Sequence, residues 1–288
     1  MIMLDPWGGG ISGLKLLSIL KMGFGGKWVK IIKLSGLSYE ETMQVIPPNT
    51  ELLGYVGSTA HGTLIPKDDP NSIDDIDILG VCIAEEQVYF GLKNFEQKEK
   101  KYKEWDSVVY EIRKFFRLLL KQNPNVLGLL WLEPHNYIHK SEVGQLIIDN
   151  RSLFISKQAY HSFSGYAHGQ LHRMTHGACL GYMGAKRKEL VEQFGYDCKN
   201  AAHLIRMLRM GIEFLGDGEL RVFRQDAHEL KEIKQGRWTL ERVQREADDL
   251  FKLAKEAYVR SPLPPLPKHG DAERLLIEIL RSRFLGCR

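Results

Sequence analysis

Residues 75–81 constrain the fold most, because they alternate acidic and apolar side chains and then become wholly apolar (Asp-Ile-Asp-Ile-Leu-Gly-Val). Residues two apart on an extended strand point to the same face. We therefore expect the carboxylates of Asp75 and Asp77 to lie side by side, with Ile76 and Ile78 facing a core. Paired carboxylates repel each other unless a positive group lies between them, and hard divalent cations take oxygen ligands of this kind. The stretch predicts a strand with a metal site on one face.

A glycine-containing turn precedes this strand. Tyr55 and Val56 are expected to end a short buried strand, and residues 57–62 (Gly-Ser-Thr-Ala-His-Gly) then turn, with two glycines free to adopt positive φ. Backbone N–H groups in such a turn can bind phosphate oxygens, especially where a helix begins. A phosphate site beside a pair of metal-binding carboxylates is what nucleotidyl transfer needs.

The next elements are a strand and a helix that follow each other directly. Residues 105–111 are expected to form a short strand, and the helix after it is expected to end at Asn123, because Pro124 disfavours helix in the preceding residue. The helix carries apolar residues at helical spacing, which are Ile112, Phe115, Phe116 and Leu119. From Arg151 onward the sequence is helical, apart from a stiff proline-rich spacer at residues 261–267.

These motifs resemble those of a known enzyme superfamily. Gly57-Ser58 followed by Asp75-Ile76-Asp77-Ile78 is similar to the signature of the DNA polymerase beta superfamily of nucleotidyltransferases. Residues 57–62, 115–127 and 196–206 extend the resemblance to the predicted nucleotidyltransferases of the RNA-repair-associated phage and bacterial type. The chain departs from that pattern at Gly128, where an acid is expected.

The resemblance implies an α+β fold, in which a small mixed β-sheet core with flanking helices is followed by an all-helical C-terminal domain. We expect an N-terminal lead-in (1–45), a catalytic domain (46–145), a helical domain (146–260), and the proline-rich spacer with a C-terminal helix (261–288).

The resemblance also implies a set of metal-binding and catalytic residues. Asp75 and Asp77 would bind Mg²⁺ or Mn²⁺ together with a third carboxylate from a neighbouring strand. Asp106 is the candidate for this third ligand, and Glu111 is the reserve. These carboxylates would hold the metal and form the catalytic set.

A second group of residues is expected to bind the nucleotide. The resemblance implies that Gly57 and Ser58 hold the triphosphate of an NTP, such as ATP. Lys199, His203 and Arg206 lie at positions i, i+4 and i+7, on one face of an expected helix, and would neutralise phosphates. The alternative is a solvated helix face, and the identity of the NTP stays open.

The expected reaction is transfer of a nucleoside monophosphate from an NTP to a hydroxyl, with release of pyrophosphate. An RNA end is the favoured acceptor, while a protein side chain or a small molecule stays open. The same core would serve an oligonucleotide-forming or second-messenger synthase. The alternative from another class of protein is a non-catalytic nucleic-acid-binding or toxin-neutralising module. An incomplete set of metal-binding carboxylates would indicate such a module.

Composition sets the remaining expectations. The formal net charge of +4 permits a polyanionic partner without requiring one. The four cysteines lie far apart in the sequence without zinc-ligand spacing, so we expect reduced thiols. Residues 1–20 lack the charge pattern of a secretory signal, and no segment approaches the ~20 apolar residues of a membrane helix. We expect a cytoplasmic protein, and the oligomeric state is open.

Overall fold

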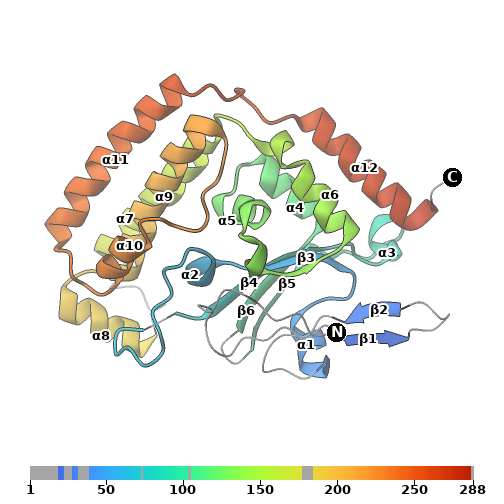
Figure 1. Ribbon diagram of the computed structural model, residues 1–288, viewed down its shortest axis with the longest axis horizontal. Helices are drawn as coiled ribbons and strands as arrows, with labels where there is room; N and C mark the ends of the chain where they lie inside the picture. Colours follow the sequence, from blue (N-terminus) through green and yellow to red (C-terminus); the bar gives the residue numbers. More distant parts are fainter. Residues whose placement is uncertain are drawn as a thin grey trace, which may run out of the picture.

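The computed structural model describes residues 19–22, 28–31, 39–72, 74–102, 105–176 and 184–286. A five-stranded sheet with the strand order β5-β6-β4-β3-β7 lies at its centre (Figure 1). These strands are β3 (Thr50–Tyr55), β4 (Ile76–Cys82), β5 (Gln97–Tyr102), β6 (Trp105–Glu111) and β7 (Tyr137–Lys140). The strands β1 (Ile19–Met22) and β2 (Trp28–Ile31) form a separate antiparallel pair.

The sheet is mixed, because β4 pairs with β3 in antiparallel and with β6 in parallel orientation. Side chains on β4 alternate as expected: Leu79 and Val81 belong to a large apolar cluster, whereas Ile78 and Cys82 belong to a smaller one. The edge strand β5 pairs antiparallel with β6, and its middle residues are exposed.

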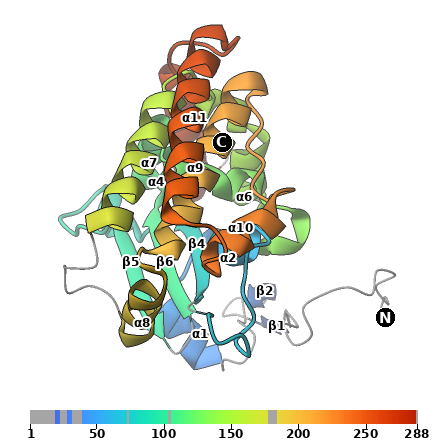
Figure 2. The ribbon, with the colours of Figure 1, turned by 90° about the vertical axis from the view of Figure 1, so that its left-hand side faces the viewer.

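Most helices lie on one side of this sheet (Figures 1 and 2). In chain order the helices are α1 (Tyr39–Val45), α2 (Gly57–Ala60), α3 (Glu86–Tyr89), α4 (Ile112–Leu120), α5 (Pro124–Gly128), α6 (Glu142–Asp149), α7 (Ala159–His176), α8 (Ala185–Phe194), α9 (Cys198–Asp217), α10 (Ala227–Lys234), α11 (Leu240–Arg260) and α12 (His269–Leu285). Short 3₁₀ helices cover Leu129–Trp131, Pro134–Asn136 and Arg151–Phe154. The α+β fold class predicted from the sequence is confirmed.

The strand-to-helix connection at β6 forms as expected. The helix α4 begins immediately after β6, and the carboxylate of Glu111 accepts a hydrogen bond from the backbone N–H of Lys114 in its first turn. The next helix begins at Pro124, after Asn123 caps it by accepting from two backbone N–H groups. The four apolar positions predicted for α4 are all buried.

One large apolar core joins the sheet to the helical layer. It contains residues from β3 and β4, and it continues through α4, α5, α7, α9, α11 and α12. A smaller core lies on the other face of the sheet, around Trp105 and Tyr55. The large core crosses the boundary expected at residues 145/146, so the division into these domains stays a prediction. Most of the expected lead-in, residues 1–45, lies outside the described residues.

Within the described ranges, no helix combines the length and the apolar character that crossing a membrane would take.

Candidate active site

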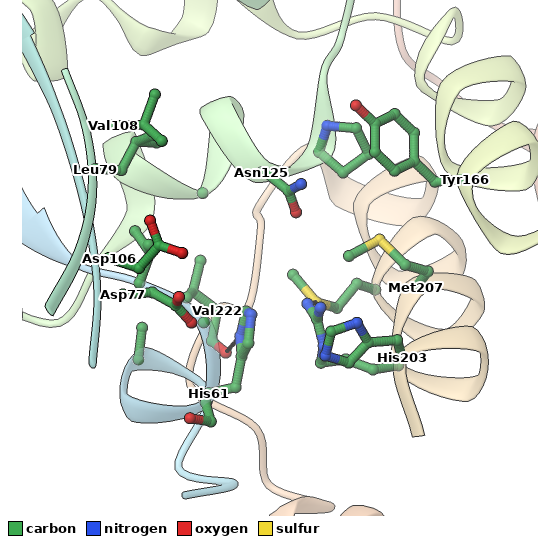
Figure 3. Close-up of a pocket in the computed structure, with 18 of the residues that line it drawn as sticks. His61, Asp77, Leu79, Asp106, Val108, Asn125, Tyr166, His203, Met207 and Val222 are labelled. Carbon is green, nitrogen blue, oxygen red and sulfur yellow. Dashed lines mark hydrogen bonds between the residues drawn. The ribbon is translucent and has the colours of Figure 1, made fainter. Parts of the chain in front are cut away.

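A cavity of about 480 Å³ lies between the sheet and the helical layer. This volume is in the range of small-molecule sites, roughly 300–1,000 Å³. Its walls come from β4, β6 and α2 on one side, and from α5, α7 and α9 on the other. Figure 3 shows Asp77 and Asp106 on one side of the cavity and His203 and Met207 on the other.

The parallel pairing of β4 and β6 brings two predicted acids together. Asp77 and Asp106 are direct partners in the strand register, and both line the cavity. Asp77 also lies against the glycine turn, since a Cβ placed on Gly57 would collide with its carboxylate oxygen Oδ2. Gly57 has a φ of +61°, and Gly62 a φ of +69°, as the sequence predicted for this turn.

Burial raises the pKa of Asp77 from 3.8 to about 6. The neighbouring charge of Lys199 opposes this shift, while the carboxylates of Asp106, Asp75 and Asp74 add to it. The ionised form of Asp77 therefore lowers the free energy of unfolding of the protein. A cation bound in front of it would offset that cost.

Asp75 is held differently from Asp77. Its oxygen Oδ2 accepts a hydrogen bond from the Lys101 ammonium at 2.8 Å, and its side chain is 46% exposed. The adjacent Asp74, which had no predicted role, is buried and lines the cavity. It forms ion pairs with Lys234 and, at 3.5 Å, with Lys199.

The reserve ligand Glu111 lies at the far end of β6, opposite Cys82 on β4. It is buried and accepts a hydrogen bond of 2.7 Å from the hydroxyl of Tyr89, so the structure does not bring it to Asp77. In the ranges described, no three His, Cys, Asp or Glu side chains converge closely enough to hold a metal ion by themselves.

The opposite wall carries the three basic residues predicted on one helix face. Lys199, His203 and Arg206 all project from α9 into the cavity lining. Arg206 is only 6% exposed, and it has no ion pair with a described carboxylate, its hydrogen bond going to the sulfur of Met210 at 3.3 Å. Burial and the nearby Arg224 lower its pKa to about 9, so it stays charged at neutral pH. A buried cation without a paired carboxylate favours an anionic ligand.

Two histidines in the cavity are neutral at physiological pH. Burial and the charge of Arg206 lower the pKa values of His61 and His203 well below 6.5. The Nδ1 atom of His61 lies 2.8 Å from the carbonyl oxygen of Val222. A carbonyl oxygen can only accept, so Nδ1 carries the proton and Nε2 is left as an acceptor. The sequence predicted the turn around His61 but gave this residue no role.

Neutral side chains also line the cavity. Tyr166 and Gln170 come from α7, and Asn125 comes from α5. The Tyr166 hydroxyl accepts a hydrogen bond of 2.8 Å from the side-chain amide of Asn123. The sequence predicted no role for these residues. The pattern of an amphipathic helix does not distinguish an aromatic or amide side chain that lines a cavity from one that faces solvent.

Comparisons with known proteins bear on this geometry. No curated protein matches the chain. A nucleotidyltransferase-like protein from Exiguobacterium sibiricum 255-15 has a solved structure that is similar to the chain at 13% identity and a TM-score of 0.29, covering 85% of this chain and 78% of that one. A family model described as the RNA repair pathway DNA polymerase beta family matches residues 38–250.

That match includes the glycine turn, the carboxylates of β4 and β6, and the basic residues of α9. The resemblance predicted from the motifs is confirmed at this level, that of a DNA polymerase beta-type nucleotidyltransferase. The chain belongs to the RNA repair pathway DNA polymerase beta family.

Proposed function

We propose that the protein transfers a nucleoside monophosphate from an NTP to a hydroxyl group, with release of pyrophosphate. The observation that carries this proposal is that acidic and basic side chains face each other across one cavity. Asp77 and Asp106 line one wall, and the buried cation of Arg206 lines the other together with Lys199. A triphosphate and a divalent cation complement these two walls.

The donor set fits a hard divalent cation such as Mg²⁺ or Mn²⁺. Asp77 and Asp106 would hold it, since Mg²⁺ is usually bound by one or two carboxylates and by substrate phosphates. Asp75 would join them by leaving Lys101, and exposed ion pairs of this kind contribute only about 0–1 kcal/mol. When bound, the cation would neutralise the triphosphate and the leaving pyrophosphate and would lower the pKa of the attacking hydroxyl.

The chain's own residues would position the triphosphate. The guanidinium of Arg206 would donate to phosphate oxygens as charge-assisted hydrogen bonds, and Lys199 would add a second positive charge. The turn at Gly57 and Ser58 lies beside Asp77 and would donate backbone N–H groups and a hydroxyl. Holding the reactants in line is the main contribution a protein makes to phosphoryl transfer.

An RNA end is the acceptor we propose. The family description supports RNA as the context of the reaction, and the formal net charge of +4 is compatible with a polyanionic acceptor. A protein side chain or a small molecule would use the same cavity, so the test must offer all three acceptor classes.

The experiment supplies each of the four NTPs, labelled at the α-phosphate, with Mg²⁺ or Mn²⁺ and a pool of RNA, DNA and protein. The double variant Asp77→Asn/Asp106→Asn is the inactive comparison, and Asp248→Asn, an exposed acid on α11, is the matched control. We expect label in RNA with the wild type and the control, and none with the double variant. Label in protein or in a small product would identify that class of molecule, and not RNA, as the acceptor. Binding of NTP without any transfer would favour the non-catalytic alternative.

A further inference from the structure

The helix α4 presents a basic face to solvent. The helix and its C-cap residue Lys121 contain four basic residues and no acidic one, whereas α11 carries five of each. Lys114, Arg117 and Lys121 lie at positions i, i+3 and i+7, on the side of α4 opposite its buried residues. A helix face that is merely solvated typically mixes the two signs of charge, as α11 does. The basic face of α4 differs from this pattern.

Only one of the three charges on this face is balanced by a described acid. Lys114 pairs with Glu96 at 2.9 Å. Arg117 and Lys121 are exposed, and neither forms an ion pair with a described carboxylate. The hydrogen bond and the charge of Lys114 lower the pKa of Glu96, and the charge of Arg117 adds to this shift, so the two basic side chains lie on the same side of α4. Two positive charges at the surface thus stay available to an anionic partner.

The basic face meets the rim of the cavity at both of its ends. At its start, the ammonium of Lys114 lies 5.9 Å from the ring centroid of Tyr110, which lines the cavity. At its end, the carbonyl of Lys121 accepts a hydrogen bond of 2.8 Å from the hydroxyl of Ser162, one helical turn before Tyr166 on α7. Tyr166 also lines the cavity (Figure 3). The basic face therefore runs from one rim tyrosine to the other.

The two rim tyrosines come from opposite walls of the cavity and lie near each other. Tyr110 belongs to β6, and Tyr166 belongs to α7, where it is exposed. Burial raises the pKa of Tyr110, and the charges of Glu99 and of an ionised Tyr166 add to this shift, which places both groups near its hydroxyl. Tyr110 lies four residues, or about 13 Å, along β6 from Asp106. Aromatic rings beside a basic face are typical of proteins that bind single-stranded nucleic acid.

The basic face matches the acceptor better than it matches the NTP. The triphosphate of the NTP would be bound by Arg206 and Lys199 on α9, in the cavity. Arg117 and Lys121 lie outside the cavity, about 6 Å apart along the axis of α4. A nucleic-acid strand carries a further phosphate at every nucleotide, so it can reach the cavity and these two cations at the same time.

We infer that the acceptor is a single-stranded RNA end that enters the cavity across this rim, with phosphates on Arg117 and Lys121 and bases on the rings of Tyr110 and Tyr166. The inference rests on the proposed function, and it adds the route by which the RNA end reaches the carboxylates. Contacts to phosphates carry no sequence information, and stacking tolerates every base. The rim would accept RNA ends of any sequence whose last nucleotides are unpaired.

The first test measures RNA binding without NTP, so that no turnover occurs. A fluorescent single-stranded RNA of mixed sequence would be titrated with the full chain at several salt concentrations. In Arg117→Gln/Lys121→Gln the slope of log affinity against log salt should be shallower by about 1.4, because each phosphate contact on a single strand contributes about 0.7. The same relation predicts binding that is about 10- to 30-fold weaker at 0.1 M salt. Arg245→Gln/Lys255→Gln removes the same two charges from exposed positions on α11 and should bind as the wild type.

A second pair of variants tests the stacking. Tyr166→Leu should bind about tenfold more weakly at every salt concentration, with an unchanged slope, because stacking on a ring is not ionic. Tyr166→Phe keeps the ring and loses only the hydroxyl that meets Asn123, so it should bind as the wild type. The wild type should bind the single strand more tightly than a blunt RNA duplex of the same length. This last comparison stands even where a variant fails to fold.

The outcomes separate this inference from the function beneath it. Equal slopes for Arg117→Gln/Lys121→Gln and for the α11 control would overturn the route across α4. Equal affinity of the wild type for the single strand and the duplex, or equal binding by Tyr166→Leu and Tyr166→Phe, would overturn the stacking on the rim. These results would leave nucleotidyl transfer standing. Failure of the wild type to transfer label from any NTP to any acceptor would overturn the proposed function itself.

Discussion

At the scale of single residues, the ionised Asp77 lowers the stability of the folded protein and is placed to bind a cation. Its pKa is about 6 in the folded protein, against 3.8 for the free side chain. The folded state therefore binds more protons than the unfolded state between these values, and the stability of the protein falls as pH rises from about 4 to about 6.

Asp77→Asn should accordingly stabilise the protein while abolishing transfer. We expect a gain of about 1–3 kcal/mol in the free energy of unfolding at pH 7, since one unit of pKa shift corresponds to about 1.4 kcal/mol. The gain should shrink as pH falls from about 6 to about 4 and disappear well below 3.8, where the wild-type carboxyl is protonated in both states. Chemical denaturation at pH 4 and pH 7 measures both effects. A variant less stable than the wild type at pH 7 would contradict the unfavourable ionisation of Asp77.

Arg206 should matter for the nucleotide and little for the fold. Arg206→Met keeps the length of the side chain and removes a buried charge that has no ion pair with a described carboxylate. We expect NTP affinity to fall by about 10- to 100-fold, because a hydrogen bond to a charged group contributes about 1.5–3 kcal/mol. Thermal stability should be unchanged or higher.

Arg245→Met, an exposed position on α11, is the control for this loss of charge. Equilibrium titration with a non-hydrolysable NTP analogue compares the two variants. Equal affinities would show that Arg206 does not contact the triphosphate.

At the scale of elements, the turn between β3 and α2 joins the phosphate side to the metal side. Gly57→Ala would strain a backbone at a φ of +61° and push on the carboxylate of Asp77. We expect a loss of about 1–2 kcal/mol in stability, and a loss of nucleotidyl transfer through displacement of Asp77.

Gly195→Ala is a matched control for backbone strain. Gly195 ends α8 with a φ of +79°, and nothing lies within 4 Å of a Cβ at this position. Its replacement should cost similar stability and leave transfer unchanged. If both variants lost activity in proportion to stability, the contact between Gly57 and Asp77 would have no role of its own.

The elements around the turn were predictable because their signals are local. The alternation in β4 and the direct passage from β6 to α4 depend on neighbouring residues only. The approach of Asp106 to Asp77 did not follow from these local signals, because only the resemblance implied a third carboxylate from a neighbouring strand. The orientation of Asp75 was not predictable, because it depends on Lys101, which reaches it from the edge strand β5. Non-local packing of this kind leaves no periodic trace in the sequence.

The helices that line the cavity also have contacts that their sequence does not predict. The sequence predicts helical structure from Arg151 onward, but nothing in it indicates that Tyr166 lines a cavity. In the structure Tyr166 is 36% exposed at the cavity, where its hydroxyl meets Asn123 from another element. Likewise, the buried ion pair of Asp74 joins it to Lys234, a residue far along the chain on α10. Only the fold brings these partners together.

At the scale of the whole molecule, one apolar core serves both the sheet and the helices. A fragment of residues 39–145 would expose apolar side chains of the sheet, α4 and α5 that belong to one core with α7, α9 and α12. We expect this fragment to lack a cooperative unfolding transition, whereas the full chain should unfold in one step.

Calorimetry of the full chain and of the fragment tests this expectation. Two separate transitions in the full chain, or a fragment that unfolds cooperatively, would support independent domains with a boundary at residues 145/146. A single transition would mean that the cavity and the core are stabilised together, so that core substitutions in α9 also affect nucleotide binding.

The last described helix has a consequence for the order in which the protein is assembled. Phe284 on α12 packs against Tyr89 and Phe90, with ring centroids 5.1 and 5.7 Å apart. Tyr89 in turn donates to Glu111, at the end of the strand that carries Asp106. This end of the sheet is covered only once α12 has been synthesised. Contacts that span so much of the chain form slowly, so we expect the apolar surface at this end of the sheet to be covered late in folding.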